Sequence, residues 1–92
     1  MRRRIDRWID GDSGIFSDGS RFRLARVRAP ERGQRGSSLA TRTAAGMTGR
    51  SNGLVNVNVV GYSYGRQVVE MSNRDGSINN RLIGLGYRKQ GI

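Results

Sequence analysis

Carboxylates in two short motifs are the side chains of this sequence whose spacing favours chemistry. Asp10-Gly11-Asp12 lies where one predicted strand ends, and Ala29-Pro30-Glu31 follows another, so these carboxylates could meet at the rim of a small barrel. Carboxylate and backbone carbonyl oxygens are the ligands that calcium prefers. The alternative is that the Asp-Gly pairs only form turns, for which both residue types are well suited.

Missing residue types narrow the possible chemistry. The chain has no Cys and no His, which excludes disulfides, cysteine or histidine zinc ligands, and nucleophile–histidine pairs. The single lysine, Lys89, does not form part of a phosphate-binding loop, so no nucleotide cofactor is expected. Any remaining chemistry must use Asp, Glu, Arg and Tyr, together with an oxygen-preferring cation if a metal takes part.

Positive charge dominates the 92 residues. The formal charge is +10, and all but one of the 17 cations are arginines. Guanidinium groups bind phosphate oxygens in pairs, so DNA or RNA is the expected partner, ahead of a membrane surface. A genome whose codons favour arginine is the alternative explanation. No run approaches 18 apolar residues, which argues against a membrane span.

The first residues do not read as a secretion signal. A basic start at residues 2–4 is followed by Asp6, Arg7 and Asp10, where such a signal needs an apolar segment. We therefore expect a cytoplasmic protein, or a secreted one if a leader has been removed.

The first thirty residues are predicted to be β structure. Residues from about 4 to 10 alternate between two faces, which predicts a strand that turns at Gly11. Asp18-Gly19 between apolar residues is a strong hairpin signal, because both residues accept a positive φ. The apolar phase then slips near Ala25-Arg26, which predicts a β-bulge or a sharp bend, and Pro30 is expected to end the third strand.

A helix is predicted after a polar loop. The apolar residues between Leu39 and Met47 recur at helical spacing, which predicts a helix over about 38–48. Ser37 or Ser38 is the expected N-terminal cap, since a serine hydroxyl accepts a hydrogen bond from a free backbone N–H of the first turn.

Two strands and a second helix complete the predicted order. Valines alternate with asparagines over 55–59, and the chain is expected to turn from Gly61 into a strand at 66–71. Asp75-Gly76-Ser77 then turns the chain and caps a short helix. The apolar stripe and the end of that helix are Ile78, Leu82, Leu85 and Gly86.

The order β-β-β-α-β-β-α predicts the fold class. It indicates a mainly β protein that also contains α-helices. The fold expected is a five-stranded Greek-key barrel of the oligonucleotide-binding type (OB-fold) with two helices. A chain of 92 residues has room for one small core, so residues 1–92 are expected to form a single domain.

Five motifs, in this order and with fitting gaps, resemble the staphylococcal nuclease (thermonuclease) family. Their combination is far more specific than any one of them. The likeness covers roughly residues 5–87 and implies an OB-fold barrel with helices, in agreement with the predicted order. The motifs are Ile9-Asp10-Gly11-Asp12-Ser13, Asp18-Gly19 through Phe22-Arg23-Leu24, Ala29-Pro30-Glu31, Tyr64-Gly65-Arg66 and Asp75-Gly76-Ser77-Ile78-Asn79.

The resemblance implies catalytic roles. It implies a calcium ligand at Asp12 and a general base at Glu31, acting on a water that attacks phosphorus. Arg23 and Arg66 would bind the scissile phosphate and neutralise the charge that builds on a five-coordinate phosphorus. Each role suits the chemistry of the residue that would carry it.

Other matched positions carry a structural role or depart from the family. Asn79 matches a structural polar residue at the start of the second helix. Tyr64 precedes the second arginine as expected, and its ring would either contact the nucleotide or pack. Arg28 stands where the family usually has a second calcium-binding aspartate, and Tyr62 stands where it often has an acid.

Arg28 leaves two hypotheses about calcium open. A guanidinium cannot ligate a cation and repels one nearby. In the first hypothesis a weak calcium site remains, formed by Asp12, with Asp10 as a weaker ligand, the Ala29 carbonyl and several waters. In the second, Arg28 binds the substrate phosphate as a third guanidinium.

We therefore expect a monomeric nuclease that hydrolyses phosphodiester bonds of DNA or RNA, with weakened or altered calcium dependence. The alternative is a non-catalytic nucleic-acid-binding OB-fold domain that has lost its metal site. In the nuclease hypothesis Arg23, Glu31 and Arg66 are catalytic, while Arg28 and Tyr64 bind substrate. Neither zinc nor a nucleotide cofactor is expected.

Overall fold

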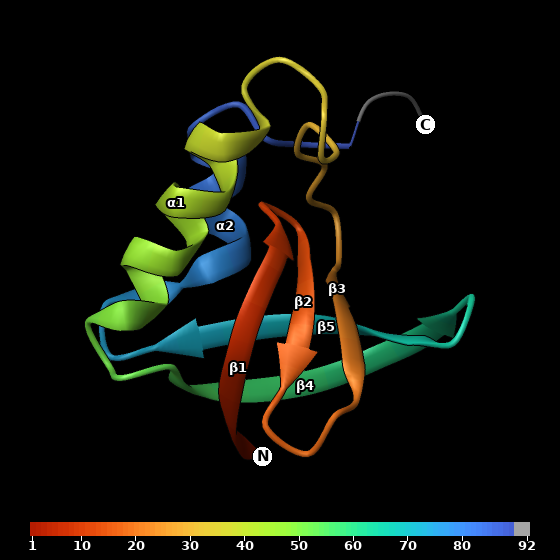
Figure 1. Cartoon of the computed structure of the whole chain (residues 1–92). Helices are drawn as coiled ribbons and strands as arrows, with labels where there is room; N and C mark the ends of the chain where they lie inside the picture. Colours follow the sequence, from red (N-terminus) through yellow and green to blue (C-terminus); the bar gives the residue numbers. More distant parts are fainter. Residues whose placement is uncertain (90–92) are drawn as a thin grey trace.

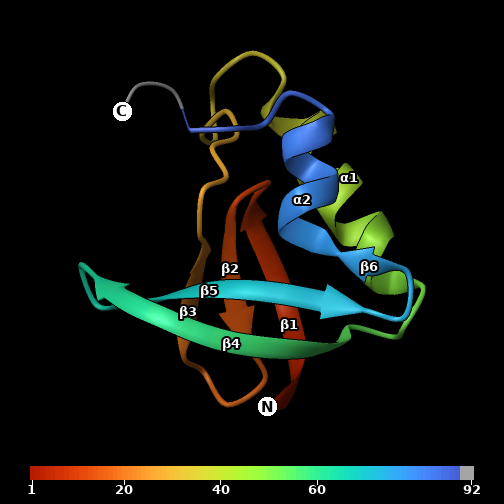
Figure 2. The same ribbon diagram turned by 180° about the vertical axis from the view of Figure 1, so that it is seen from behind.

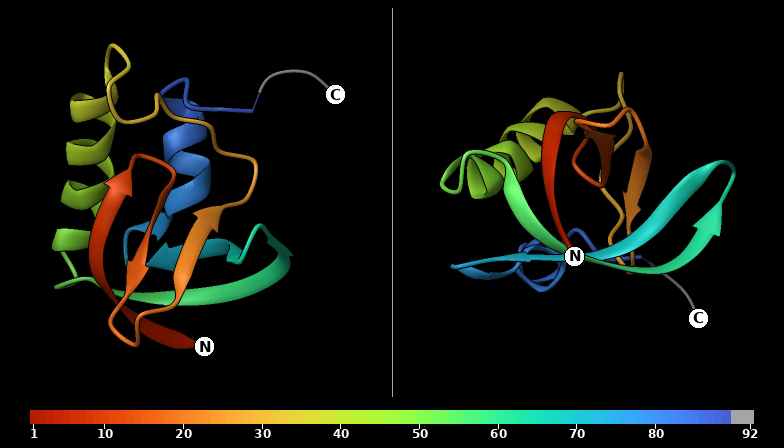
Figure 3. Two further views of the ribbon diagram at one scale, coloured as in Figure 1. Left: turned by 45° about the vertical axis from the view of Figure 1, so that its right-hand side comes forward. Right: turned by 90° about the horizontal axis from the view of Figure 1, so that it is seen from below.

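Six strands form one sheet that closes on itself. A computed structural model describes residues 1–89, and the strands hydrogen-bond in the order β3-β2-β1-β4-β5-β6. A further, parallel pairing of β3 with β5 closes the sheet into a ring (Figures 1 and 3). The strands are β1 (Arg2–Asp10), β2 (Ser13–Phe16), β3 (Arg21–Leu24), β4 (Leu54–Ser63), β5 (Arg66–Asn73) and β6 (Gly76–Ser77).

Two helices, α1 (Ser37–Gly49) and α2 (Ile78–Gly84), lie next to each other on one side of this sheet (Figures 1 and 2). The predicted mainly β class with two helices is therefore confirmed for residues 1–89. The sheet has one strand more than predicted, because the two residues of β6 pair with the end of β5 where the sequence predicts only a turn. Neither helix of this part of the chain is long and apolar enough to cross a membrane.

The predicted Asp18-Gly19 hairpin between β2 and β3 is confirmed. Gly19 has a φ of 87°, and the Asp18 carboxylate accepts hydrogen bonds from the N–H and the hydroxyl of Ser20 at 2.9 and 2.6 Å. Before this hairpin, β1 pairs with β4 near its start and with β2 further along. It therefore carries Asp10 to the end of the sheet at which β2 begins.

The chain bends sharply after β3. This strand ends at Leu24, and Arg26 has a φ of 66°, which is the bend that the slip of the apolar phase predicts. The prediction that the strand runs to Pro30 is wrong, because the left-handed backbone at Arg26 turns the chain out of the sheet. Two hydrogen bonds of 2.8 Å from the Arg26 guanidinium to the Glu70 carboxylate hold the bend.

Asn79 fixes the same bend from inside the protein. Its side chain is fully buried, and its amide group donates hydrogen bonds to the carbonyls of Ala25 at 2.9 Å and Val69 at 3.0 Å. Its amide oxygen accepts a hydrogen bond from the Met71 N–H at 2.8 Å. The prediction of a structural polar residue at this position is confirmed. We call these four residues the Asn79 junction.

Helix α1 packs against the sheet through small residues. Its range is close to the predicted one, but its N-cap is Gly36 with a φ of 86°, so the predicted serine cap is wrong. A left-handed backbone at the cap favours glycine over serine. Leu39 is 57% exposed, so its predicted place in the apolar stripe is also wrong. Two buried alanines of α1 let the helix approach the sheet instead. The buried residues of α1 are Ala40, Ala44, Met47 and Thr48.

Strands β4 and β5 form a long hairpin. The predicted turn at Gly61 is wrong, because β4 continues to Ser63 with an irregularity in its register between Val59 and Gly61. The turn lies at Tyr64 and Gly65, whose φ angles are 51° and 76°. Two positive φ angles in a two-residue turn match the twist of a β-hairpin. The first residue after this turn is Arg66.

The predicted cap of the second helix is confirmed. The Ser77 hydroxyl accepts a hydrogen bond from the Asn80 N–H at 3.0 Å, and Ile78 and Leu82 are fully buried. Leu85 is 60% exposed and lies just beyond the last residue of α2, so its predicted place in the apolar stripe is wrong.

Two aromatic rings, Phe16 and Phe22, are buried in the core, and the partly buried Trp8 packs against it. Phe22 lies 4.6 Å from Phe16 and 5.1 Å from Trp8 between ring centroids, and the Trp8 contact is edge-on. The Trp8 indole N–H donates a hydrogen bond to the Thr48 hydroxyl at 3.0 Å, which joins β1 to α1. Strand β1 and helix α1 are therefore held in a fixed relation next to the site described below.

Candidate functional site

One small cavity gathers most of the predicted site residues. Its volume is about 210 Å³, and it lies where the β1–β2 turn, β3, the loop after β3 and the start of β5 meet. Three carboxylates and three guanidiniums line it, and we call it the arginine–carboxylate cavity. Its lining residues are Asp10, Asp12, Arg23, Arg28, Ala29, Glu31 and Arg66.

Strand pairing brings the two arginine-bearing strands together. Arg23 lies on β3 and Arg66 opens β5, and these two strands pair in parallel. Asp12 lies beside β3, because its carbonyl accepts a hydrogen bond from the Leu24 N–H at 2.8 Å. The closure of the sheet therefore positions residues that are far apart in the sequence.

Gly11 positions the turn that carries both aspartates. A Cβ at this residue would lie 2.7 Å from the Ala40 Cβ and 2.8 Å from the Ala29 Cβ, well inside the usual contact distance between carbon atoms. The glycine thus lets the turn lie between α1 and the loop after β3. A larger residue would push Asp10 and Asp12 away from their present places.

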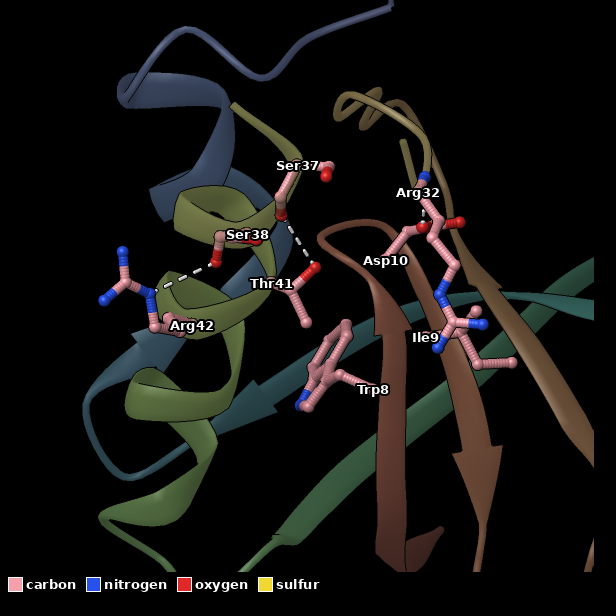
Figure 4. A pocket seen from close by; sticks show the side chains of 8 residues that line it. All are labelled: Trp8, Ile9, Asp10, Arg32, Ser37, Ser38, Thr41 and Arg42. Carbon is pink, nitrogen blue, oxygen red and sulfur yellow. Dashed lines mark hydrogen bonds between the residues drawn. The ribbon is translucent and has the colours of Figure 1, made fainter. Parts of the chain in front are cut away.

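The two aspartates also hold the loop that follows β3. Asp12 Oδ2 accepts a hydrogen bond from the Ala29 N–H at 3.1 Å, and Asp10 Oδ1 accepts one from the Arg32 N–H at 2.9 Å (Figure 4). Glu31 lies between these two attachment points and is exposed. The aspartates therefore restrain the segment that carries the predicted general base.

The charged groups of the cavity are not paired with one another. Within residues 1–89, every ion pair with an N···O distance up to 4.0 Å lies elsewhere: Arg3–Asp18, Arg26–Glu70 and Arg50–Asp75. Guanidiniums without carboxylate partners remain able to bind an anionic ligand in a bidentate manner. The cavity therefore combines three guanidiniums that have no carboxylate partner at ion-pair distance with three carboxylates.

Burial raises the pKa of the Asp12 carboxyl. The Ala29 N–H lowers this pKa, the charge of Asp10 raises it and the Arg23 guanidinium lowers it, but the loss of solvent around Asp12 has the largest effect. Desolvation disfavours the charged form of a carboxyl group. The ionised Asp12 is therefore held in the cavity at some expense of folding stability.

The donor set of the cavity fits a calcium ion poorly. Calcium takes six to eight oxygen ligands, whereas residues 1–89 contain no group of three or more acidic side chains placed to share a metal ion. Asp10 and Asp12 each use one carboxylate oxygen on a backbone N–H, and three guanidiniums line the same cavity. The expected role of the Ala29 carbonyl as a ligand stays a prediction. The three guanidiniums therefore count against a calcium site here, although three carboxylates balance their charge.

The predicted site residues fall into two groups. Seven of them line the arginine–carboxylate cavity, and Arg28 is among these. Tyr64 lies instead at the tip of the β4–β5 hairpin with 96% of its surface exposed, and Tyr62 is 78% exposed on the same hairpin. A substrate contact of Tyr64 stays a prediction.

Sequence reasoning missed a recess beside the cavity, which we call the Trp8 recess. Its volume is about 330 Å³, and Asp10 lines both spaces. Part of its wall comes from pairs of α1 residues four positions apart. This spacing on the polar face of the predicted helix is the one sequence pattern that could have indicated the recess. The lining residues are Trp8, Ile9, Asp10, Arg32, Ser37, Ser38, Thr41 and Arg42 (Figure 4).

The fold and the cavity define a class of protein: a small, mainly β protein with a closed sheet and an arginine-rich, carboxylate-bearing cavity. No family model matches the chain, and no curated protein matches it either. The likeness to the staphylococcal nuclease family therefore depends on the five motifs and their order.

Proposed function

We propose that this protein is a nuclease that binds the backbone of DNA or RNA in the arginine–carboxylate cavity and hydrolyses a phosphodiester bond there. The observation that carries the proposal is that Arg23, Arg28 and Arg66 line the same cavity as Glu31. The five motifs support the same function. In this proposal the closed sheet is a Greek-key barrel of the OB type, five-stranded apart from the short β6.

The three arginines bind the phosphate group. Each guanidinium offers paired N–H donors that match two phosphate oxygens, and each carries a charge that no carboxylate within residues 1–89 neutralises at ion-pair distance. The negative charge on phosphorus oxygens grows when a fifth oxygen attaches. Fixed cations around them therefore stabilise the transition state more than the ground state.

Glu31 acts as the general base. Its carboxylate takes a proton from water while the water oxygen bonds to phosphorus and the bond from phosphorus to the leaving sugar oxygen breaks. The leaving oxygen takes a proton from solvent, and Glu31 returns its proton to solvent. The exposure of Glu31 gives water access to it, and the loop attachments at Ala29 and Arg32 keep it near the arginines.

Cleavage assays with a matched pair of variants test this function. Single-stranded DNA, duplex DNA and RNA are incubated with the protein in calcium, in magnesium and in chelator. Glu31→Gln should lower the cleavage rate about 10²–10⁴-fold with little change in binding, because it removes only the base. Asp6→Asn, the same loss of charge at an exposed carboxyl of β1 outside the cavity, is the control. Equal rates for wild type and Glu31→Gln would refute the assigned base.

Arg28→Asp separates the two hypotheses about calcium. Because the donor set fits calcium poorly and Arg28 lines the cavity with two other guanidiniums, we expect cleavage in chelator. Arg28→Asp should abolish this cleavage, since it removes a phosphate-binding guanidinium. A calcium site weakened by Arg28 predicts the opposite result: Arg28→Asp would then tighten calcium binding and raise calcium-dependent cleavage. If neither calcium affinity nor cleavage changes, Arg28 has no part in the site.

The thin donor set for calcium favours one second candidate, a nucleic-acid-binding domain without catalysis. It would keep the arginines and bind with a steep salt dependence, since phosphate contacts release counterions. Binding without cleavage under all three metal conditions would favour this candidate. Binding that does not depend on salt would refute both.

A further inference from the structure

We propose that a single strand of nucleic acid crosses the arginine–carboxylate cavity and is held on both sides of it, in the Trp8 recess and in a second flanking recess. The inference rests on the proposed function and extends it from one phosphate to a strand of several nucleotides. The second recess, which we call the Tyr87 recess, has a volume of about 640 Å³. It is lined by Arg28, Ala29, Pro30, Gln34, Arg35, Gly86, Tyr87 and Arg88.

Both recesses adjoin the arginine–carboxylate cavity, and they share no lining residue with each other. The cavity shares Asp10 with the Trp8 recess, and it shares Arg28 and Ala29 with the Tyr87 recess. A scissile phosphate in the middle has a nucleotide on each side. The strand therefore has a recess available in either direction from the bond that is cut.

Each flanking recess combines an aromatic ring with two further arginines. Trp8 lies with Arg32 and Arg42, which Figure 4 shows on the loop and on α1 respectively, and Tyr87 lies with Arg35 and Arg88. Sites for single-stranded nucleic acid combine cations that follow the backbone with aromatic rings that contact unpaired bases. The ion pairs within residues 1–89 use none of these four arginines.

The composition favours a single strand over a duplex. A base can contact Trp8 or Tyr87 only when it is unpaired, because pairing keeps its faces stacked within the helix. Hydroxyl groups of Ser37, Ser38 and Thr41 add polar partners for phosphate or sugar in the Trp8 recess. Duplex nucleic acid would contact the arginines without filling either recess.

The test uses oligothymidylates of two and twelve nucleotides with protein carrying Glu31→Gln, so that the probe stays intact. Trp8 is the only tryptophan of the chain, so its fluorescence reports directly on the Trp8 recess. Affinity is measured by fluorescence anisotropy at several salt concentrations for three paired variants. They are Arg32→Ala with Arg42→Ala, Arg35→Ala with Arg88→Ala, and, as a charge-matched control, Arg2→Ala with Arg21→Ala.

We expect the twelve-nucleotide probe to bind at least tenfold more tightly than the dinucleotide and to change Trp8 fluorescence, which the dinucleotide and a duplex leave unchanged. Each flanking pair should weaken the longer probe about tenfold and lower its salt slope by about 1.4, the value for two lost phosphate contacts on a single strand. The dinucleotide should be affected no more than by the control pair, whose residues are exposed and lie at the opposite end of β1 and β3 (Figure 1).

Two outcomes would overturn the inference in distinguishable ways. If Arg23→Ala abolishes binding but either flanking pair behaves like the control, the cavity binds phosphate and the two-sided strand is refuted. If no probe binds, or if Arg23→Ala leaves binding unchanged, the proposed function itself fails.

Discussion

The Asn79 junction and the arginine–carboxylate cavity both adjoin the chain segment after β3, but they differ in whether their polar side chains are paired. At the junction a fully buried amide makes three hydrogen bonds of 2.8–3.0 Å to backbone groups. In the cavity, six charged side chains lie together without an ion pair among them in the part of the chain that is described.

This difference separates stability from binding. A buried amide with satisfied hydrogen bonds stabilises the one arrangement that satisfies it. Unpaired charges in a cavity stabilise the fold little, but they keep their capacity for a ligand. The junction therefore keeps the bend after β3 in place, so that Arg28 and Glu31 need no ion pairs of their own to be positioned.

The largest expected effect is that of Asn79→Ala. The variant leaves the Met71 N–H and the Ala25 carbonyl without their partner in a buried place, and each such loss costs about 1–3 kcal/mol. We expect the free energy of unfolding, measured by urea denaturation, to fall by about 2–4 kcal/mol. Asn56→Ala, at an exposed position of β4, should change it by less than about 0.5 kcal/mol.

Arg23→Ala provides the other half of this comparison. It should weaken nucleic-acid binding while changing the free energy of unfolding by less than about 0.5 kcal/mol, since Arg23 makes no ion pair within residues 1–89. An equal loss of stability in Asn79→Ala and Arg23→Ala would show that the two regions do not differ as described.

A smaller effect is expected for Gly11→Ala, which probes how the cavity is tied to the scaffold. Its new Cβ would be forced against Ala40 and Ala29, and overpacking of this kind costs about 1–3 kcal/mol. We expect lower stability together with weaker nucleic-acid binding, because both aspartates and the loop that they hold must move.

Gly46→Ala is the matched control for this prediction. Gly46 lies within α1, and a Cβ there would have open space around it. The change should stabilise the protein by about 0.5–1 kcal/mol through helix propensity and leave binding unchanged. A Gly11→Ala variant with full stability and full binding would contradict the proposed role of Gly11.

Local turn chemistry was predictable at two places, although the turn expected at Gly61 and the serine cap expected for α1 were wrong. Asp18-Gly19 and Ser77 do what their residue types favour, because the turn and the cap depend on a few neighbouring atoms. The gathering of the predicted cavity residues followed from motif order, since the strands that carry them pair as a closed sheet requires. Their chemical roles stay predictions.

Features that depend on distant contacts were not predictable. The sequence around Pro30 does not show that Asn79, far along the chain, binds the Ala25 carbonyl and ends β3 early. Leu39 fits an apolar stripe by spacing alone, but α1 presents its alanines to the protein because Gly11 and the sheet leave room only for small side chains. The Trp8 recess likewise exists only once α1 has packed beside β1.

The smallest expected effect concerns the pH dependence of Asp12. Burial raises the pKa of this carboxyl in the folded state, so the folded protein binds the proton more tightly than the unfolded chain does. Stability therefore falls as pH rises from the ordinary aspartate pKa of about 3.9 through the higher folded value. Asp12→Asn removes this loss and still offers an oxygen to the Ala29 N–H. We expect a slightly higher Tm than wild type at pH 7 and no difference below about pH 3.

Asp18→Asn should respond in the opposite sense and serves as the control. Hydrogen bonds from Ser20, followed by the charge of Arg3, lower the pKa of Asp18. The ionised Asp18 therefore stabilises the fold above the ordinary aspartate pKa, and this stabilisation is lost as pH falls through the lower folded value. At pH 7 this variant should have a lower Tm than wild type. Thermal denaturation of both variants from pH 3 to pH 7 checks the two signs. If Asp12→Asn lowers the Tm at pH 7, the ionised carboxylate stabilises the fold, and the cavity is a structural element like the Asn79 junction.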